Sequence, residues 1–489
     1  MNYLDCSIRE IHEALVSKKV TPLELTQEAL KRAKEDKQNC FEKILEDEAL
    51  SFASALVEPE EDNLLWGIPY VAKDNFSTKG IETTASSNIL NGYVPCFDAT
   101  VIAKLKDKKC VLIGKTTLDE LAMGGTGTTG HKGVTYNPYD PTHKRMIGGS
   151  SCGSAAAVAA SIVPFALGSD TGDSVRKPAS FGGLVGMKPT WSRISRYGLF
   201  PFAPSLDHVG FFSRYVDDNA IILSCLSGRD EMDSTSSSKA VENYADCHLS
   251  SLKGKKIAVL REITDSISDE VLLSKFASSL TKMKKDGAEI CYIDFGLELL
   301  QSVYPTYIVI SCAEATSNDA NLDGIKFGPY YGGSSYQEVM FNARTKGFSE
   351  LIKRRFVIGS FALMKENQED LFLRAQRNRA KLVERTNQIL HEYDVIYVPA
   401  APSIAPCIGG ASNKLSDEYL IADNHLALGN FAGLPSITLP LALENGFPLG
   451  VNFMGRAFEE KELYGIAERF EELSGLAGLA VSNMKEGNL

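Results

Sequence analysis

Short apolar runs alternate with stretches of helical character along much of this 489-residue chain. The runs are GIPYVA, CVLIG and IVPFALG, and the helical stretches begin near Asp98, Thr117 and Ser154. Runs that are apolar throughout are typical of strands covered by helices on both faces. The alternation therefore predicts an α/β fold, and a chain of this length with 44% apolar residues can bury a large core.

Two helices are predicted at the start of the chain. Apolar residues recur at helical spacing within residues 7 to 18, and Thr21-Pro22-Leu23-Glu24 reads as a capping box with proline at the first helical position. Later the pattern predicts a strand at KIAVL, a helix over about 269 to 285 and a strand at EICYIDF. After these elements the pattern predicts a charged helix over about 368 to 393. It then predicts strands near VIYVP, SITLPL and GVNFM and a helix over 459 to 473.

One large domain is expected between two smaller pieces. Residues 1 to 60 are expected to form an N-terminal helical segment packed on the core, residues 61 to 480 the main domain, and residues 481 to 489 a tail. The polar, serine-rich stretch near 229 to 255 is the one plausible seam. We interpret it as an excursion within the main domain.

Charge and cysteine usage limit the possible functions. The net charge of -11 argues against a surface that grips nucleic acid, because phosphate contacts need clustered Lys and Arg. The ten cysteines are dispersed without a CxxC pair, which predicts reduced thiols. The N-terminus carries charges where a signal peptide needs an apolar run, and the longest uncharged apolar stretch, 155 to 167, is too short to span a bilayer. We therefore expect a soluble, cytoplasmic protein without membrane contact.

Glycine and serine are concentrated between residues 147 and 179, on tight turns around an apolar run. Ser150 lies in the run GGSS, and Ser174 follows 24 residues later in the run GDS. Upstream, Lys73 is a basic residue that interrupts an apolar strand in GIPYVAKDNF. A hydroxyl nucleophile needs such exposed turns and an adjacent base. The pattern predicts a Ser/Ser/Lys triad.

Other motifs offer weaker alternatives. GTGTTG at 125 to 130 satisfies GxGxxG but follows a helical stretch rather than a strand, which disfavours dinucleotide binding. IGKTT resembles the end of a P-loop, yet Lys109 occupies the position of the required upstream glycine. GSSCG formally matches a nucleophile elbow centred on Ser151, but the preceding residues are polar and rich in turns, so an α/β-hydrolase is the weaker interpretation.

Histidine and cysteine chemistry is also disfavoured. The seven histidines show no metal-binding spacing, so no metal site is predicted. Cys152 lies at an expected helix N-terminus, where a thiol would be acidified. However, no histidine is placed to pair with it, so we do not expect it to be the nucleophile.

Three motifs follow one another along the chain: Lys73 in AKDN, the GGSS run and the run GSDTGxSVRxPA. They occur in the same order in the amidase signature family of serine hydrolases, which this chain resembles. Segments such as GKTTLDELAMGG, SRYGLFPFAPSLDHVG and NFAGLPSITLP extend the resemblance over nearly the whole length. They are similar to the branch of the family that serves tRNA-dependent amidotransferases. The resemblance implies a single large α/β/α sandwich around a mixed, mostly parallel sheet.

The resemblance also implies roles for the three residues. Ser174 would attack a side-chain amide, and Ser150, following a cis peptide from Gly149, would relay its proton to Lys73. Lys73 must then be neutral. A free lysine has a pKa near ~10.4, so half neutrality at pH 7 needs a shift of about three units, worth roughly 4 kcal/mol. Burial among the apolar residues of GIPYVA and hydrogen bonds with serine hydroxyls are the available causes.

The loop before Ser174 is expected to stabilise negative charge. The backbone N–H groups of Thr171, Gly172 and Asp173 would form an oxyanion hole, which needs small residues so that donors approach to ~3 Å. Turn geometry is the competing explanation for those small residues. Asp170 and Arg176 flank the loop and are placed either to pair and hold it or to form a solvated surface pair.

Substrate choice is implied by the same branch of the family. Arg355 would bind the α-carboxylate of glutamine and Asp423 its α-ammonium, and an Arg fork suits a carboxylate because it binds with two hydrogen bonds. Two residues depart from the family pattern. Asp173 stands where a glycine is usual, beside the nucleophile, and Thr128 stands where relatives generally carry a glutamate bordering the ammonia passage.

The implied function is that of a glutaminase subunit, which hydrolyses glutamine to glutamate and ammonia. The ammonia would pass to a partner subunit that amidates misacylated Glu-tRNA(Gln) or Asp-tRNA(Asn) with ATP. The expected partners are subunits B and C of a heterotrimer, with tRNA contacted mainly through a partner. This chain is expected to bind no cofactor, and ATP and Mg are expected on the partner. The alternatives are a free-standing amidase acting on small amides and a scaffold subunit silenced by Asp173.

Overall fold

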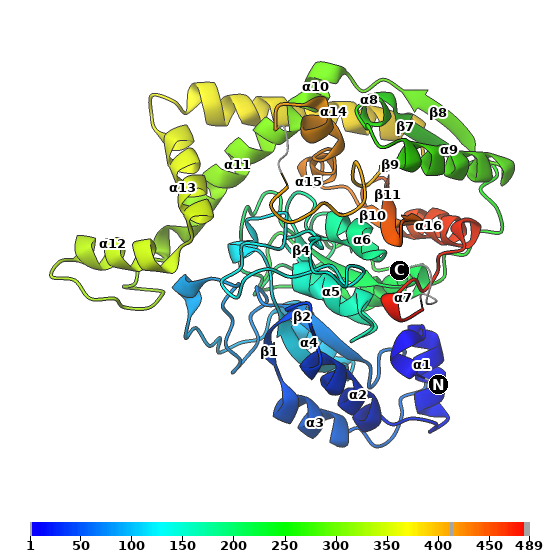
Figure 1. Cartoon of the computed structure of the whole chain (residues 1–489), viewed down its shortest axis with the longest axis horizontal. Coiled ribbons are helices and arrows are strands. Elements are labelled where there is room, and N and C mark those ends of the chain that lie inside the picture. The colour runs from blue at the N-terminus through cyan, green and yellow to red at the C-terminus, as the bar shows by residue number, and fades with distance from the viewer. Residues whose placement is uncertain (1, 411–413, 484–489) are drawn as a thin grey trace.

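One continuous sheet of eleven strands runs through the computed structural model, which describes residues 2–410 and 414–483 (Figure 1). The strand order is β1-β3-β2-β4-β6-β5-β10-β11-β9-β7-β8. The strands are β1 Phe41–Ile44, β2 Pro69–Lys73, β3 Val111–Thr116, β4 Phe165–Asp170, β5 Val185–Lys188, β6 His208–Ser213, β7 Lys256–Leu260, β8 Glu289–Ile293, β9 Val395–Pro399, β10 Ser436–Glu444 and β11 Phe447–Met454. Helices flank this sheet, which confirms the predicted α/β class.

The sheet is mixed, as predicted, but it is not mostly parallel. The parallel neighbours are β3 with β2, β2 with β4, β9 with β7 and β7 with β8, all toward the two ends of the sheet. Every neighbouring pair from β4 through β6, β5, β10 and β11 to β9 is antiparallel. The prediction of a mostly parallel sheet was therefore wrong for the centre of the sheet.

The connections explain this error. Along the chain, β4 is followed by α6 (Arg176–Gly182) and then by β5. Such a strand–helix–strand order is typical of two parallel strands joined by a crossover helix. The later strand β6 then pairs between them, antiparallel to both. β10 and β11 are joined by the short turn at Asn445 and Gly446 and form a hairpin. Sequence alternation does not reveal which strand fills the gap between two others.

Most predicted helices are present. The helices of eight or more residues are α1 Ile8–Val16, α2 Pro22–Lys34, α3 Glu46–Ser54, α4 Thr100–Asp107, α5 Cys152–Ala159, α7 Val216–Leu226, α9 Glu270–Lys285, α11 Val303–Asn318, α12 Tyr336–Gly347, α13 Glu350–Leu363, α14 Arg374–Glu392 and α16 Glu460–Ser474; the shorter ones besides α6 are α8 Arg261–Asp265, α10 Leu297–Gln301 and α15 Ala427–Phe431. The capping box of Thr21 and Glu24 is confirmed at the start of α2. The helix predicted near Thr117 is wrong, because the chain forms only a 3-10 turn, Glu120–Ala122, with Leu121 and Ala122 at positive φ.

The first sixty residues pack on the main sheet and join the larger of its two hydrophobic clusters. β1 is an edge strand of the main sheet, and buried side chains of α1, α2 and α3 join the large hydrophobic cluster that includes β2, β4 and α16. The stretch 229–255 carries no helix or strand. Of the predicted tail, Val481–Asn483 forms a 3-10 turn, and residues 484 to 489 lie outside the described part of the chain.

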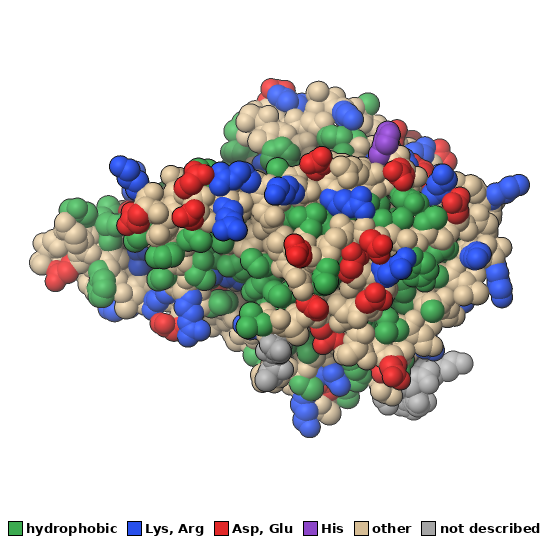
Figure 2. Space-filling model, turned by 90° about the horizontal axis from the view of Figure 1, so that it is seen from above, with side chains coloured by type: hydrophobic (Ala, Val, Ile, Leu, Met, Phe, Trp, Pro, Cys, Tyr) green, Lys and Arg blue, Asp and Glu red, His purple; other side chains and the backbone are tan. Residues whose placement is uncertain are grey.

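Helices α11, α12 and α13 extend away from the sheet as an arm (Figure 1). The sequence analysis did not predict them. α11 packs between α13 and α14, so its apolar residues face more than one neighbour and show no single stripe. Exposed apolar side chains cover part of the arm, including Phe341, Val357 and Phe361 (Figure 2).

Within the described ranges 2–410 and 414–483, no helix is both long enough and apolar enough to cross a membrane.

Candidate active site

Two neighbouring parallel strands bring the predicted base to the predicted nucleophile loop. Lys73 is the last residue of β2, and β2 pairs in parallel with β4, whose end carries Ser169 and Asp170. Because parallel strands end at the same edge of a sheet, the side chain of Lys73 and the loop that follows Asp170 meet there. The site therefore lies at the carboxyl edge of β2 and β4.

Lys73 is fully buried and contacts two hydroxyl groups. Its Nζ atom lies 2.7 Å from Ser150 Oγ and 2.9 Å from Ser169 Oγ. Asn75 Nδ2 donates to the same Ser169 hydroxyl at 2.9 Å. The structure thus brings together Lys73 and Ser150, as the sequence analysis predicted, and adds Ser169 as a second contact.

Burial lowers the pKa of Lys73 to about 7, although nearby acidic groups, among them Cys152, Asp119 and Asp170, act in the opposite direction. Desolvation disfavours the ammonium form, and no carboxylate of the described residues forms an ion pair with this lysine. A neutral amine has one lone pair, so it can accept a proton from one hydroxyl while it donates to another. The two serine contacts match that arrangement.

The GGSS run forms the turn that leads into α5. The peptide bond between Gly149 and Ser150 is cis, as the family resemblance implied. Ser151 ties this turn to β4, because its hydroxyl donates to Ser169 O at 3.1 Å and accepts from Ser169 N at 3.3 Å. Its own N–H donates to Ser174 O at 3.2 Å. Ser151 is therefore a structural link between the two serine loops and not an elbow nucleophile.

Ser174 lies in the loop between β4 and α6 and is 3% exposed. Its hydroxyl makes no hydrogen bond with the described residues, so no direct bond to Ser150 is formed. The N–H groups of Thr171, Gly172, Asp173 and Ser174 likewise have no acceptor among the described residues. Unpaired N–H donors of this kind are what an oxyanion hole needs, and they lie beside the hydroxyl group of the candidate nucleophile.

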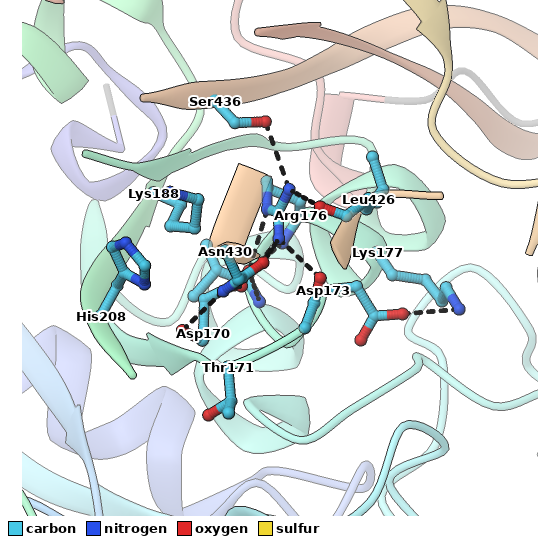
Figure 3. A network of polar contacts seen from close by, with 12 residues as sticks. Asp170, Thr171, Asp173, Arg176, Lys177, Lys188, His208, Leu426, Asn430 and Ser436 are labelled. Carbon is cyan, nitrogen blue, oxygen red and sulfur yellow. Dashed lines mark hydrogen bonds and ion pairs between the residues drawn. The ribbon is translucent and has the colours of Figure 1, made fainter. Parts of the chain in front are cut away.

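Asp170 and Arg176, at the two ends of this loop, form an ion pair that holds it in place (Figure 3). Both are fully buried, and Arg176 binds the carboxylate through Nη2 at 2.8 Å and Nε at 3.1 Å. Arg176 Nη2 also donates to Gly172 O at 2.7 Å and to Asn430 Oδ1 at 2.6 Å. Despite burial, the charge and hydrogen bonds of Arg176 hold the pKa of Asp170 well below its usual range. The pair is thus the buried brace of the loop, and the surface-pair alternative was wrong.

The glycine-rich run at 125 to 130 binds a carboxylate of its own chain. The buried Asp119 side chain accepts the N–H groups of Thr126, Gly127, Thr128 and Thr129 at 2.9 to 3.1 Å. Gly149 packs so closely that a Cβ atom there would lie 1.9 Å from Asp119 Oδ2. The GxGxxG run therefore forms the turn beside Ser150.

Asp173 forms an ion pair with Lys177, which also pairs with Asp423; the sequence analysis did not predict these contacts. Lys177 Nζ lies 2.6 Å from Asp173 Oδ2 and 3.2 Å from Asp423 Oδ1, and it donates to Asp423 O at 2.6 Å. Figure 3 shows the Asp173 carboxylate directed toward Lys177. Asp173 does not adopt a positive φ, so the loop keeps its shape without the glycine that is usual there.

Arg355 lies on α13, is half-buried, and forms no ion pair with a carboxylate of the described residues. Its Nε and Nη1 atoms are buried without a hydrogen-bond partner among the described residues, and its guanidinium carbon lies 5.7 Å from the ring centre of Phe202. The charge of Arg355 opposes the rise in the pKa of Tyr307 that burial causes. Tyr307 in turn packs on the nucleophile loop, where a Cβ on Gly172 would meet its ring at 2.9 Å. Tyr307 thus lies against the loop and within the electrostatic influence of Arg355.

Tyr307, Gly172 and Asp173 also line a small cavity of about 20 Å³, together with Tyr304, Asn424 and Ala427. This volume is enough for about one water molecule.

Several site residues were missed. Ser169, Asn75 and Lys177 lie inside the motifs that drew attention to their neighbours, and a period-two count along β4 would have placed Ser169 on a defined face of the strand. Asp119 gave no local signal, because its partners are backbone groups of a loop.

Cys152 is buried, and burial raises its pKa to about 12, so it is not an activated thiol. Over the described residues, no group of three or more His, Cys, Asp or Glu side chains is arranged to hold a metal ion.

Comparisons with known proteins give a consistent result. The sequence profile of the family described as Amidase matches residues 24–464. The chain is 38% identical over 482 residues to the A subunit of the glutamyl-tRNA(Gln) amidotransferase of Streptococcus pneumoniae, covering 97% of each chain. The crystal structure of the corresponding A subunit of glutamyl-tRNA(Gln) amidotransferase from Thermotoga maritima is 35% identical with a TM-score of 0.77, covering 96% of this chain and 95% of that one. An amidase family protein from Bacillus anthracis is 26% identical with a TM-score of 0.77, covering 96% and 91%.

Proposed function

Because this chain belongs to the amidase family, we propose that it is the glutaminase subunit of a tRNA-dependent amidotransferase. It hydrolyses glutamine to glutamate and ammonia through Lys73, Ser150 and Ser174. The observation that carries the proposal is the fully buried Lys73 amine, 2.7 Å from Ser150 Oγ and unopposed by an ion-pair partner. The similarity to two proteins that are named as subunits of a glutamyl-tRNA(Gln) amidotransferase supports this choice within the family.

In the proposed reaction, neutral Lys73 accepts the proton of Ser150, and Ser150 accepts the proton of Ser174. The Ser174 oxygen then attacks the side-chain carbonyl carbon of glutamine. The carbonyl oxygen becomes an oxyanion, which the free N–H groups of residues 171 to 174 stabilise. Ammonia leaves with a proton returned through the same relay, and water hydrolyses the acyl-serine to glutamate. Substrate binding has to bring the two serine hydroxyls into contact, and the bond between Ser151 N and Ser174 O already holds their loops together.

Glutamine is the proposed substrate because two charges are available for its zwitterionic end. Arg355 is half-buried and forms no ion pair with a carboxylate of the described residues, and an anionic ligand would stabilise such a partly buried cation. The α-carboxylate of glutamine fits that requirement. Asp423, half-buried near the nucleophile loop, is the proposed partner of the α-ammonium.

The ammonia is proposed to pass to a partner subunit, which amidates Glu-tRNA(Gln) or Asp-tRNA(Asn) with ATP. In this proposal subunits B and C complete a heterotrimer, and tRNA, ATP and Mg bind mainly to the partners. The net charge of -11 supports that division of labour, because an acidic surface repels nucleic acid. Thr128, at the turn held by Asp119, borders the proposed passage.

The test is glutamine turnover by the chain assembled with its partner subunits. Wild-type protein should release glutamate and ammonia, and Arg355→Ala should lose most of that activity while a simple aliphatic amide is cleaved at its former rate. The matched control is Arg354→Ala, the exposed neighbour on α13. If Arg355→Ala leaves glutamine hydrolysis unchanged and small amides are cleaved well, the chain is a free-standing amidase instead.

The scaffold alternative is tested with a serine-reactive fluorophosphonate probe. A competent site should label Ser174, and Ser174→Ala should abolish the label and the turnover without unfolding the protein. An intact fold without labelling of the wild-type protein would favour a silent scaffold.

A further inference from the structure

Lys177 is the buried centre of a partly buried cluster of three charges next to Ser174. It is 7% exposed, and its three N–H donors are all used, by Asp173 Oδ2, Asp423 Oδ1 and Asp423 O. Asp173 precedes Ser174 in the loop, Lys177 is the second residue of α6, and Asp423 follows the turn Glu418–Ala422. The cluster therefore joins the nucleophile loop to the segment that carries the proposed ammonium site.

The net charge of this cluster is negative. Two carboxylates share one ammonium, and the second oxygen of each carboxylate makes no hydrogen bond with the described residues. The other nearby cation, Arg176, is fully engaged by Asp170, Gly172, Asn430 and Leu426. Burial and the charge of Asp173 raise the pKa of Asp423, whereas Lys177 opposes the rise. One further cation would balance the charges.

Lys177 also offsets the negative charge that Asp173 places beside the proposed oxyanion hole. A carboxylate beside the oxyanion hole disfavours the developing negative charge on the substrate, because like charges repel strongly where water is excluded. The 2.6 Å contact with Lys177 neutralises that carboxylate locally. The same lysine, however, competes with a substrate ammonium for Asp423, and Asp173 weakens that competition by holding Lys177 from the other side.

We propose that Asp173 and Lys177 are positioning residues that act as a charge-matched pair: Lys177 shields the oxyanion hole from Asp173, and Asp173 keeps Asp423 available for the α-ammonium of an amino-acid substrate. This inference rests on the proposed function and deepens it. The site selects amides that carry an α-ammonium. The charge of the cluster without substrate is -1 in the wild type and would be 0 without Asp173, -2 without Lys177, and -1 again without both.

The experiment compares two substrates in the assembled complex: glutamine, and glutaramate, the analogue in which a hydrogen replaces the α-ammonium. The variants are Asp173→Asn, Lys177→Gln and the double variant, with Asp173→Gly as a second neutral replacement. Lys34→Gln, which breaks the exposed ion pair with Glu46, is the matched control. Fluorophosphonate labelling of Ser174 verifies that each variant has a folded site.

Asp173→Asn should lower the preference for glutamine over glutaramate by about tenfold or more, through a higher KM for glutamine, because Lys177 then neutralises Asp423. Lys177→Gln should lower kcat for both substrates, because Asp173 becomes an unshielded charge beside the oxyanion. The double variant should restore both the preference and kcat to within about threefold of the wild type, since independent structural damage would instead accumulate.

An unchanged preference in Asp173→Asn and Asp173→Gly, with turnover intact, would overturn this inference and leave the proposed function standing. A double variant that is as poor as its worse parent would overturn it as well. Failure of the unmodified complex to hydrolyse glutamine would instead overturn the proposed function, and with it this inference.

Discussion

At the scale of single residues, the proposed chemistry depends on one lysine whose pKa burial lowers to about 7. Lys73 could reach this state because β2 delivers it to a place where its contacts are hydroxyl groups rather than carboxylates. Its near neighbour Lys115 shows the contrast, since that lysine is equally buried but forms an ion pair with Asp74 at 2.9 Å. The two lysines differ in partner, not in burial.

The first prediction concerns the pH dependence set by Lys73. Its pKa in the folded protein is lowered to about 7, so the neutral form needed as a base is present above that pH and is lost as the pH falls. Turnover of glutamine at saturation should fall about tenfold per pH unit below 7, to roughly a hundredth of its plateau at pH 5.

The measurement is kcat of the assembled complex from pH 5 to 9, with samples returned from pH 5 to pH 8 to verify that the loss is reversible. A flat profile across this range would rule out neutral Lys73 as the base.

At the scale of elements, the site consists of turns held by buried carboxylates. Asp170 with Arg176 holds the loop between β4 and α6, and Asp119 holds the turn at 126 to 129. Each carboxylate replaces a missing network of backbone hydrogen bonds, because these turns have no strand or helix to pair with. Rigid turns keep donors and hydroxyl groups in place before the substrate arrives.

Asp119→Ala should destabilise the protein by about 3 kcal/mol or more, because it leaves several buried N–H groups without an acceptor. The free energy of unfolding in urea measures this change, and limited proteolysis should show new cleavage near residues 124 to 130. The control is Asp62→Ala, an exposed carboxylate in the acidic loop, which should change stability by less than about 0.5 kcal/mol. Equal effects of the two substitutions would contradict the role assigned to Asp119.

At the scale of the whole molecule, α11 and α13 pack with β7 and β9 in one hydrophobic cluster, whereas α12 lies at the far end of the arm from the sheet (Figure 1). The hydrophobic cluster around β2, β4 and β10 contains side chains from Leu4 to Phe470, and a second large cluster joins β7 and β9 to α11, α13 and α14. α12 buries only Val339, Ala343 and Gly347. Its stability therefore depends on few contacts.

Hydrogen exchange of the isolated chain should show this difference. Amide protons of Tyr336–Gly347 should exchange much faster than those of Phe165–Asp170, because local opening of α12 exposes little apolar surface whereas β4 opens only with the core. Equal protection of the two segments would contradict an arm of low local stability.

What could be predicted from the sequence was local. The strands β2, β3 and β4, the capping box of α2 and the motif residues Lys73, Ser150 and Ser174 are all visible in short stretches of apolar, glycine and serine residues. The helices of the arm were missed because α11 is packed on more than one side and shows no amphipathic stripe. The 3-10 turn at Glu120–Ala122 was mistaken for a helix because its residue types favour helix, whereas its backbone is shaped by tertiary contacts.

The sequence by itself determined the class of fold, the two serine-containing turns and the family to which the chain belongs, because each of these depends on residue types at short range. Only the tertiary structure decided the antiparallel centre of the sheet, the burial that lowers the pKa of Lys73 to about 7, and the partners of Asp173 and Asp119. Those features join residues that are distant along the chain: Lys177 meets Asp423 across 246 positions. Charge balance and desolvation depend on such contacts, and no local pattern encodes them.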